Sequence, residues 1–234
     1  MVSAQSVSFD AAGDRIYAGL TNEVRVFDVS VPGKECDTRK TWKKKSEGGQ
    51  KGIVSCIATH PTLPNVYAVG TYRKTLGLYL EPHGSCLCLL TGQSGGITHI
   101  RFTADGTKIL AGGRKDPEIL VWDVRNPGQL YSSLRRKADT NQRIQFDVSP
   151  LRPDLVGSAN TDGSVTFWEL SKISSEAASA GPVEPHRVCQ DIAAGGECVN
   201  GFSFHPYEDL IATSSGQRHY SSMDCDSDGG DNSG

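Results

Sequence analysis

Short apolar runs separated by polar turns fill almost the whole chain, and their spacing repeats. The clearest example begins at residue 100, where strand-like runs at 100–102 (Ile-Arg-Phe), 109–112 and 119–122 are separated by two turns, Ala-Asp-Gly and Arg-Lys-Asp-Pro. Runs of this length, bounded by glycine, proline and aspartate, are typical of β-strands joined by turns. No long segment has the 3.6-residue periodicity of an amphipathic helix. The pattern therefore predicts meanders of antiparallel strands.

The third strand of this unit recurs along the chain, and near its end an aromatic residue is followed by an acidic residue in three of the four copies and by leucine in the other. Its copies are VRVFDV (24–29), TLGLYL (75–80), ILVWDV (119–124) and VTFWEL (165–170), with aromatic positions spaced by 52, 43 and 46 residues. WD-type blades of a β-propeller repeat at about 40–45 residues and carry a Trp-Asp pair at this position. The longer spacings predict loop insertions, and the Ser/Ala/Gly/Pro-rich segment 171–186 is one of them.

We therefore predict an all-β, WD-repeat β-propeller that is incomplete. The blades span about 7–42, 53–91, 97–134 and 142–192, and a half blade covers 199–214. Together they form a partial propeller domain over 1–218, followed at 219–234 by an acidic Ser/Gly/Asp-rich tail that is expected to be disordered. Because no further strands complete the fifth blade, the sequence predicts an open arc with exposed strand edges, as in a shortened form of a longer protein.

The composition limits the compartment and the chemistry. The chain has 234 residues, 37% of them hydrophobic, and no window approaches the ~20 continuous apolar residues of a membrane span. Neither a secretion signal nor an even, regular set of cysteines is present, since the seven cysteines are irregularly spaced. This favours the nucleus or cytoplasm and no membrane partner. Cys86-Leu-Cys88 lacks a second ligand pair nearby, so we expect neither a metal nor another cofactor.

Catalytic patterns are absent from the sequence. The six histidines are scattered, and His60-Pro61 and His205-Pro206 occupy the same position just after a first strand, which indicates architecture rather than chemistry. No Ser/His/Asp arrangement or phosphate-binding glycine loop appears. We therefore predict a protein that is not an enzyme and has no catalytic residues.

Seven runs go beyond the general blade pattern and include Arg-Lys-Asp before the Trp-Asp pair and Thr-Asn-Gln-Arg after it. They are GIVSCIATHP (52–61), LGLY (76–79), GGITHI (95–100), GGRKDPEILVWDVR (112–125), TNQRIQFD (140–147), NGFSFHP (200–206) and SGQR (215–218). In these runs the chain resembles the telomerase Cajal body protein 1 family of WD-repeat proteins over about 5–218. The family's N-terminal extension and opening blades have no counterpart in this sequence.

The resemblance implies a non-enzymatic scaffold. Such a protein binds the CAB box, a short loop element of box H/ACA small Cajal-body RNAs (scaRNAs) and of telomerase RNA, and works with H/ACA particle proteins and Cajal-body proteins. By the same resemblance it directs these particles, including the telomerase holoenzyme, to Cajal bodies in the nucleus, with some protein in the cytoplasm, and supports telomere maintenance.

The distribution of charge points to a binding face independently of the resemblance. In a propeller, the loops between strands two and three and the loops between blades open on one face, which we call the loop face. These loops hold thirteen basic and five acidic residues, whereas the rest of the chain holds 11 basic and 22 acidic residues. The basic residues are Lys43, Lys44, Lys45, Lys51, Arg73, Lys74, Arg114, Lys115, Arg135, Arg136, Lys137, Arg143 and Arg218. A mildly acidic protein is thus predicted to carry a basic face suited to a phosphate backbone.

Candidate RNA-binding residues follow from this loop position and from side-chain chemistry. They are Arg73, Lys74, Arg114, Lys115, Asn141, Gln142, Arg143, Gln217 and Arg218. Amide side chains offer donors and acceptors to bases, and Tyr72 or Arg73 is suited to stacking on an unpaired base.

Two alternatives stay open. The same face is also suited to a WD-repeat adaptor that binds a peptide. Arg114 and Arg143 have a structural alternative, packing between blades and pairing with Asp116 or Asp147, and the lysines at 43–45 have the alternative of simply solvating their loop.

Overall fold

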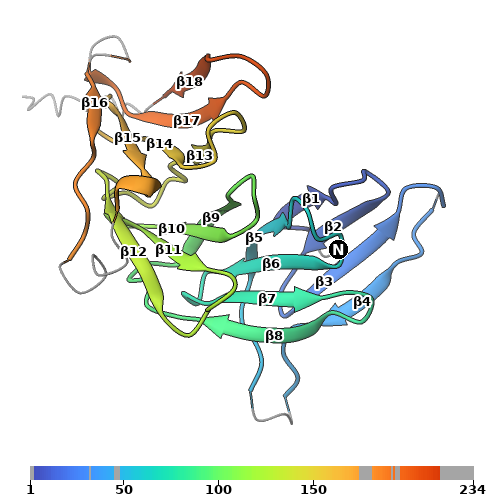
Figure 1. The fold of residues 1–234 in the computed structure, drawn as a ribbon. Coiled ribbons are helices and arrows are strands. Elements are labelled where there is room, and N and C mark those ends of the chain that lie inside the picture. Colours follow the sequence, from blue (N-terminus) through green and yellow to red (C-terminus); the bar gives the residue numbers. More distant parts are fainter. Residues whose placement is uncertain are drawn as a thin grey trace, which may run out of the picture.

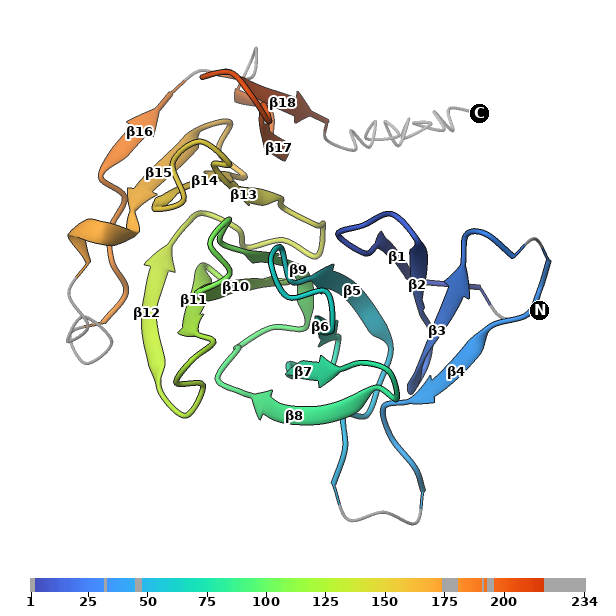
Figure 2. The ribbon, with the colours of Figure 1, turned by 45° about the vertical axis from the view of Figure 1, so that its right-hand side comes forward.

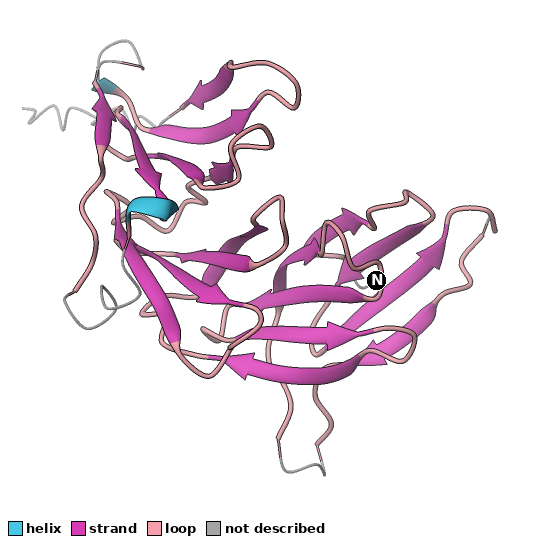
Figure 3. Ribbon diagram, viewed as in Figure 1, coloured by secondary structure: helices cyan, strands magenta, loops and turns pink. Residues whose placement is uncertain are grey.

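A computed structural model describes residues 3–31, 33–44, 48–173, 181–190, 192 and 196–216. Nearly all of the regular structure in these residues is β-strand, and the short 3-10 helix η1 (Leu170–Lys172) lies at the start of the predicted insertion (Figure 3). The predicted acidic tail at 219–234 lies outside the described residues. No helix among them has the length and apolar character needed to cross a membrane.

The strands form successive antiparallel sheets, each in sequence order. The first contains β1 (Ser6–Phe9), β2 (Arg15–Gly19), β3 (Glu23–Asp28) and β4 (Asp37–Lys40). The second contains β5 (Val54–Thr59), β6 (Val66–Thr71), β7 (Leu76–Leu80) and β8 (Ser85–Leu90). The third contains β9 (Ile97–Phe102), β10 (Lys108–Gly113), β11 (Glu118–Asp123) and β12 (Leu130–Arg135). The fourth contains β13 (Phe146–Val148), β14 (Leu155–Ala159), β15 (Val165–Glu169) and β16 (Arg187–Cys189), and a two-stranded sheet contains β17 (Val199–Phe204) and β18 (Ile211–Ser215).

The sheets follow one another around an arc, and we refer to them as blades 1 to 4 and the half blade (Figures 1 and 2). The first strand of each blade lies against the first strand of the next, from β1 through β5, β9 and β13 to β17. In the described part of the chain, no strand of blade 1 pairs with β17 or β18, so the ring is not closed. The predicted all-β fold with an incomplete WD-type propeller is confirmed.

Apolar side chains fill the space between neighbouring blades. The three interfaces between the full blades each receive an aromatic side chain from the third strand of the following blade: Tyr79 against blade 1, Trp122 against blade 2 and Trp168 against blade 3. All three are at most 3% exposed. Burial of such large side chains stabilises each contact by about 2–3 kcal/mol, so the repeated aromatic residue holds one blade to the next.

One first strand starts later than its pattern suggests. Arg143 was expected near the start of the first strand of blade 4, but β13 begins at Phe146. The preceding backbone is engaged elsewhere, since the carbonyl oxygen of Ile144 accepts a hydrogen bond from Arg136 Nη1 at 3.0 Å, and the N–H of Gln145 donates to the carbonyl oxygen of Asn200 at 2.9 Å. Arg143 therefore lies in the connection between blades 3 and 4.

Candidate RNA interface

The two kinds of loop on the loop face are hydrogen-bonded to one another. Asn22, in the turn between β2 and β3, exchanges two hydrogen bonds with Gly52 of the connection to blade 2, at 2.8 and 2.7 Å. The N–H of Lys115, in the turn between β10 and β11, donates to the carbonyl oxygen of Thr140 at 2.8 Å. The turns therefore do not move independently of the connections, and the face is a framework of interlocked loops.

The turn between the second and third strands has a left-handed residue in every full blade. This residue is Asn22 in blade 1 (φ 60°), Lys74 in blade 2 (φ 65°), Lys115 in blade 3 (φ 46°) and Gly163 in blade 4 (φ 80°). Glycine adopts this conformation freely and asparagine adopts it more readily than other residues, but a lysine there is strained. Blades 2 and 3 thus have a strained residue at the left-handed position, where blades 1 and 4 have a residue that adopts this conformation readily.

Each of the two lysines follows an arginine, so neighbouring blades repeat an Arg-Lys pair: Arg73-Lys74 and Arg114-Lys115. The Arg114 guanidinium lies 3.6 Å from the centroid of the Tyr72 ring, which is within the range of a cation–π interaction. Tyr72 immediately precedes the first pair, so this contact joins the two turns. We call the surface formed by residues 72–74, 95–96 and 114–115 the Arg-Lys junction.

Two glycines make the Arg-Lys junction possible. A Cβ on Gly95 would lie 1.9 Å from the carbonyl oxygen of Arg114, and a Cβ on Gly96 would lie 2.8 Å from that of Tyr72. The connection between blades 2 and 3 therefore passes between the two turns with no room for side chains. The sequence Gly-Gly, too short for a phosphate-binding loop, serves close backbone packing.

A buried carboxylate fixes the same connection. Asp116 is 2% exposed, and its Oδ2 accepts hydrogen bonds from Gln93 Nε2 at 3.0 Å and from the N–H groups of Ser94 and Gly95 at 3.1 Å. Its Oδ1 accepts from the N–H of Glu118 at 3.2 Å. Asp116 therefore holds the connection in place, and its negative charge also acts on the buried guanidinium of Arg136, where it opposes the lowering of the pKa by burial.

The predicted basic candidates of the junction are available to a ligand. Arg73, Lys74 and Lys115 are exposed, and Arg114 is half-buried. Among the described residues no carboxylate oxygen lies within 4 Å of any of these four side chains, because the ion pairs present involve other residues. Asn141 and Gln142 are also exposed and follow Thr140, which is hydrogen-bonded to Lys115. Six of the nine candidates thus lie on three loops that contact one another through the Tyr72–Arg114 stack and the Lys115–Thr140 hydrogen bond.

Arg143 directly follows Gln142 and differs from the other candidates in having a hydrogen-bond partner in another blade. Its Nη2 donates a hydrogen bond to the carbonyl oxygen of Ser55 in β5, at 3.0 Å. The expected alternative partners are wrong for both arginines: Asp147 pairs with Arg101 at 3.2 Å, and Arg114 stacks on Tyr72 instead of pairing with Asp116. Gln217 and Arg218 lie outside the described residues.

Three cations of the loop face are not free for a ligand. Arg136 is 3% exposed, and burial lowers its pKa to about 10. Arg135 pairs with Glu184 at 3.0 Å, and Lys137 pairs with Asp162 at 2.7 Å, which raises the pKa of that lysine. A count of charges on loops cannot distinguish a buried or ion-paired residue from one whose charge has no acidic partner.

The comparisons with known proteins identify the family. A family model described as WD domain, G-beta repeat matches residues 84–123, from the turn before β8 to the end of β11. Telomerase Cajal body protein 1 of Mesocricetus auratus is 45% identical over 94% of this chain and 39% of its own length. The Homo sapiens protein of the same name is 42% identical over 93% of this chain and 38% of its own length. The chain belongs to the telomerase Cajal body protein 1 family.

The likeness extends to a more distant member of this family. The telomerase Cajal body protein 1 homolog of Drosophila melanogaster is 31% identical over 97% of this chain. In each of these three comparisons the chain spans about two fifths of the relative's length, between 38% and 39%. What the printed names state, an association with telomerase and with the Cajal body, is therefore stated of those longer proteins.

One candidate surface residue of this family member was missed in the sequence. Trp42 follows β4 on the loop face and is partly exposed, and the Lys51 ammonium lies 4.7 Å from its ring centroid. An exposed aromatic ring beside a lysine offers a stacking surface next to a phosphate-binding charge. The signal in the sequence is Trp-Lys-Lys at 42–44, an aromatic residue directly before two lysines.

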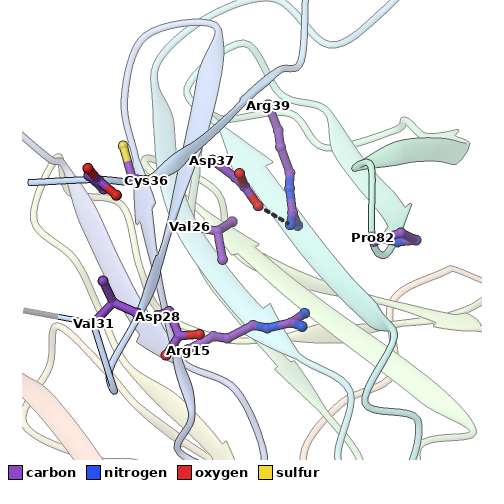
Figure 4. Close-up of a pocket in the computed structure, with 9 residues that line it drawn as sticks. Arg15, Val26, Asp28, Val31, Cys36, Asp37, Arg39 and Pro82 are labelled. Atoms are coloured by element: carbon purple, nitrogen blue, oxygen red, sulfur yellow. Dashed lines mark ion pairs between the residues drawn. The ribbon is translucent and has the colours of Figure 1, made fainter.

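Four cavities of the described structure lie away from the loop face. The one in Figure 4 has a volume of about 410 Å³ and lies in blade 1, beside the loop between β3 and β4. Its arginines are already engaged, because Arg39 pairs with the buried Glu81 and lies 3.8 Å from Asp37. Asp28 and Glu35 add further negative charge to its wall. This cavity is thus unsuited to a phosphate, and none of the four cavities is lined by a residue of the loop face.

Proposed function

We propose that this chain is a non-enzymatic RNA-binding scaffold of box H/ACA small Cajal-body RNA and telomerase particles. Its partners would be these RNAs, H/ACA particle proteins and Cajal-body proteins, and its role would be to direct the particles to Cajal bodies in the nucleus, with some protein in the cytoplasm, in support of telomere maintenance. The single observation that carries the proposal is the repeated Arg-Lys pair, held with two lysines in left-handed backbone at one junction.

The chemistry of the junction fits an unpaired, looped RNA. Arg73, Lys74 and Lys115 offer exposed charges for phosphates, and Asn141 and Gln142 offer amides that can hydrogen-bond to base edges. Unpaired bases are commonly stacked on aromatic rings or guanidinium planes, and the Tyr72–Arg114 stack presents such a plane. Strained backbone that is maintained in two adjacent blades supports a functional demand at this place.

A peptide-binding adaptor on the same face is the competing interpretation, and it is less well supported. A peptide site usually needs a concave pocket for an anchoring side chain, and the described cavities are lined by other parts of the chain. Basic, exposed and flat turns are better suited to a phosphate backbone.

The deciding experiment measures affinity for a short RNA hairpin with a CAB box in its loop at several salt concentrations. We expect the double variant Lys74→Glu/Lys115→Glu to bind at least tenfold more weakly and to lose about two units of the log–log salt slope, one per lysine. Both side chains are exposed, so the thermal unfolding midpoint should not fall.

The matched control is Lys34→Glu, an equally exposed lysine in the loop between β3 and β4. It changes the net charge in the same direction but lies outside the loop face, so it should change affinity by less than twofold. The proposal fails if the wild-type protein binds the hairpin with no salt dependence, or if the control variant weakens binding as much as the double variant.

A further inference from the structure

The chain has three tryptophans, and one of them lies on the loop face instead of between blades. Trp122 and Trp168 are at most 3% exposed and fill blade interfaces, whereas Trp42 is partly exposed and belongs to none of the four apolar clusters of the described residues. Lys51 is exposed, and its ammonium lies 4.7 Å from the centroid of the Trp42 ring. Trp42 and Lys51, which we call the Trp-Lys pair, therefore present an aromatic surface and a positive charge side by side.

Buried hydrogen bonds hold this pair in place from the residues immediately before each member. Thr41 precedes Trp42, and Gln50 precedes Lys51. The N–H of Gln50 donates to the carbonyl oxygen of Thr41 at 2.8 Å, and Thr41 Oγ1 donates to the carbonyl oxygen of Gln50 at 2.8 Å. Gln50 is fully buried, and its Nε2 donates to the carbonyl oxygen of Val69 in β6 at 2.8 Å. The Trp-Lys pair is therefore preorganised, which lowers the entropic cost of binding a ligand.

The Trp-Lys pair adjoins the Arg-Lys junction. Gly52 directly follows Lys51, and a Cβ on Gly52 would lie 2.8 Å from Cγ of Arg73, so this arginine lies on the Gly52 backbone. In the next residues, the N–H of Tyr72 donates to the carbonyl oxygen of Ile53 at 3.2 Å. The pair and the junction are thus neighbouring parts of one surface, and a ligand strand that reaches the junction can continue onto the pair.

A second contact between an aromatic ring and a lysine shows what a structural pair looks like. The Lys108 ammonium lies 4.9 Å from the centroid of the Tyr131 ring. Tyr131 packs against the apolar cluster of blades 3 and 4, and its hydroxyl donates to the carbonyl oxygen of Ile173 at 3.1 Å. Trp42 joins no such cluster among the described residues. The Tyr131 contact therefore serves the fold, and the Trp-Lys pair lacks that explanation.

We propose that the Trp-Lys pair is a second stacking site for the same RNA and holds an unpaired base beside the nucleotides at the Arg-Lys junction. In naming this RNA as the ligand, we rely on the proposed function. Proteins that bind single strands stack bases on aromatic rings and follow the backbone with basic residues. The Trp42 ring stacks on the base, and Lys51 neutralises a neighbouring phosphate. The RNA therefore needs unpaired nucleotides on one side of those at the junction.

Tryptophan fluorescence of the whole wild-type protein reports this stacking directly. Trp122 and Trp168 are buried between blades, so a base that stacks on an exposed ring quenches the emission of Trp42. We expect the CAB-box hairpin to quench the emission with the same midpoint as its binding measured by anisotropy of a labelled hairpin. Unchanged emission at saturating hairpin would overturn the proposal, and this measurement does not depend on any variant.

Variants of the pair separate stacking from a structural role. Trp42→Ala should weaken hairpin binding at least about fivefold, the lower end of what one stacked base contributes, with an unchanged salt slope because stacking releases no counterions. Trp42→Phe keeps a ring and should bind nearly as tightly as the wild type. Lys51→Gln should lower the log–log salt slope by about one unit.

The matched control is Tyr207→Ala, because Tyr207 is 83% exposed in the turn between β17 and β18, outside the loop face. It removes an aromatic ring from the surface and should leave hairpin affinity unchanged. A loss in this control equal to the loss in Trp42→Ala would refute a local stacking site. An equal loss in Trp42→Phe and Trp42→Ala would also refute it, because the loss would then not depend on an aromatic ring.

Two RNA probes distinguish a failure of this site from a failure of the proposed function. If the hairpin binds with the expected salt dependence but Trp42→Ala binds it as tightly as the wild type, the stacking site is refuted and the proposed function stands. If the hairpin does not bind but a short oligoadenylate quenches Trp42, the proposed function is refuted and the site stands as one for unpaired RNA. If neither RNA binds, both are refuted.

Discussion

The four turns between second and third strands each contain one left-handed residue but differ in which residue takes that conformation. Blades 1 and 4 use Asn22 and Gly163, which adopt it readily, whereas blades 2 and 3 use Lys74 and Lys115. The turn itself is therefore a requirement of the blade, and the lysine is not. The left-handed residue is thus a feature of the blade, whereas the lysine side chain is a feature that a ligand would require.

The comparison extends to the surroundings of each turn. At blade 1, Asn22 serves its own architecture, since its Oδ1 accepts a hydrogen bond from the Gly52 N–H at 2.7 Å. At blade 4, Asp162 Oδ1 accepts from the N–H of Ser164 and its Oδ2 pairs with Lys137. At the Arg-Lys junction the lysine ammonium groups have no such partner among the described residues. In blades 2 and 3, the strained position is therefore occupied by a lysine whose ammonium group has no acidic partner among the described residues.

The largest effect is expected from filling the space beneath the junction. Gly95→Ala places a Cβ 1.9 Å from the Arg114 carbonyl oxygen, so the connection at Gly95 and the turn at Arg114 must move apart. Because both contacts are backbone, we expect a loss of about 3 kcal/mol in the free energy of unfolding, at the upper end for overpacking, and loss of RNA binding. Urea denaturation measures the first, and the hairpin titration measures the second.

Gly128→Ala is the control for this substitution. The nearest atom to a Cβ on Gly128 is 4.0 Å away and its φ is not left-handed, so the change should be almost neutral. If Gly95→Ala were as well tolerated as this control, the close packing of the junction would be refuted.

Removing the anchor of the connection should have the next largest effect. Asp116→Asn keeps the shape but replaces one carboxylate oxygen by an amide that opposes an N–H donor, and the site is buried. We expect a loss of about 2 kcal/mol, the usual scale for a buried hydrogen bond to a charged group. Asp162→Asn, in the exposed turn of blade 4, should cost less than about 1 kcal/mol because surface ion pairs contribute little. Equal losses in the two variants would erase the distinction between the turns.

Much of the fold was predictable from the sequence, because the strand pattern and the third-strand aromatic residues recur at regular spacing. The packing of Trp122 and Trp168 between blades was predictable because a large aromatic residue that recurs at the same strand position in each repeat is expected to fill the same apolar interface. The late start of β13 was not predictable, since it depends on the bond from Arg136 to the Ile144 carbonyl oxygen, made between residues that no local pattern relates.

The loops that form the candidate site were predictable from the sequence, but which of their residues are accessible was not. Arg136 and Arg114 are both arginines on loops of one face, yet the first is buried and the second stacks on Tyr72. Burial of a loop residue depends on what the neighbouring blade places against it, which the sequence of one turn does not encode. The left-handed backbone of Lys74 and Lys115 was hidden for a similar reason, because lysine gives no signal for it.

Converting the turns of blades 2 and 3 to the type found in blade 1 tests the comparison directly. In Lys74→Asn/Lys115→Asn the strain falls, so stability should rise by about 0.5 kcal/mol per site, part of the cost of left-handed backbone in an ordinary residue. Affinity for the hairpin should fall about tenfold and the salt slope by about two units. Thermal unfolding and titration at two salt concentrations measure the two opposed effects. A variant that is both less stable and unchanged in affinity would show that the lysines serve the fold.

The reverse exchange has the smallest expected effect on RNA binding and is the most discriminating. Asn22→Lys puts a lysine at the left-handed position of blade 1 and removes the acceptor for the Gly52 N–H. Stability should fall by about 1 kcal/mol, from the added strain and the lost hydrogen bond. If RNA is bound at the Arg-Lys junction, a new charge at blade 1 should leave both affinity and salt slope nearly unchanged. An increase of about one unit in the slope would mean that the loop face binds RNA as a diffuse positive surface, and blades 2 and 3 would then differ from blade 1 in strain alone.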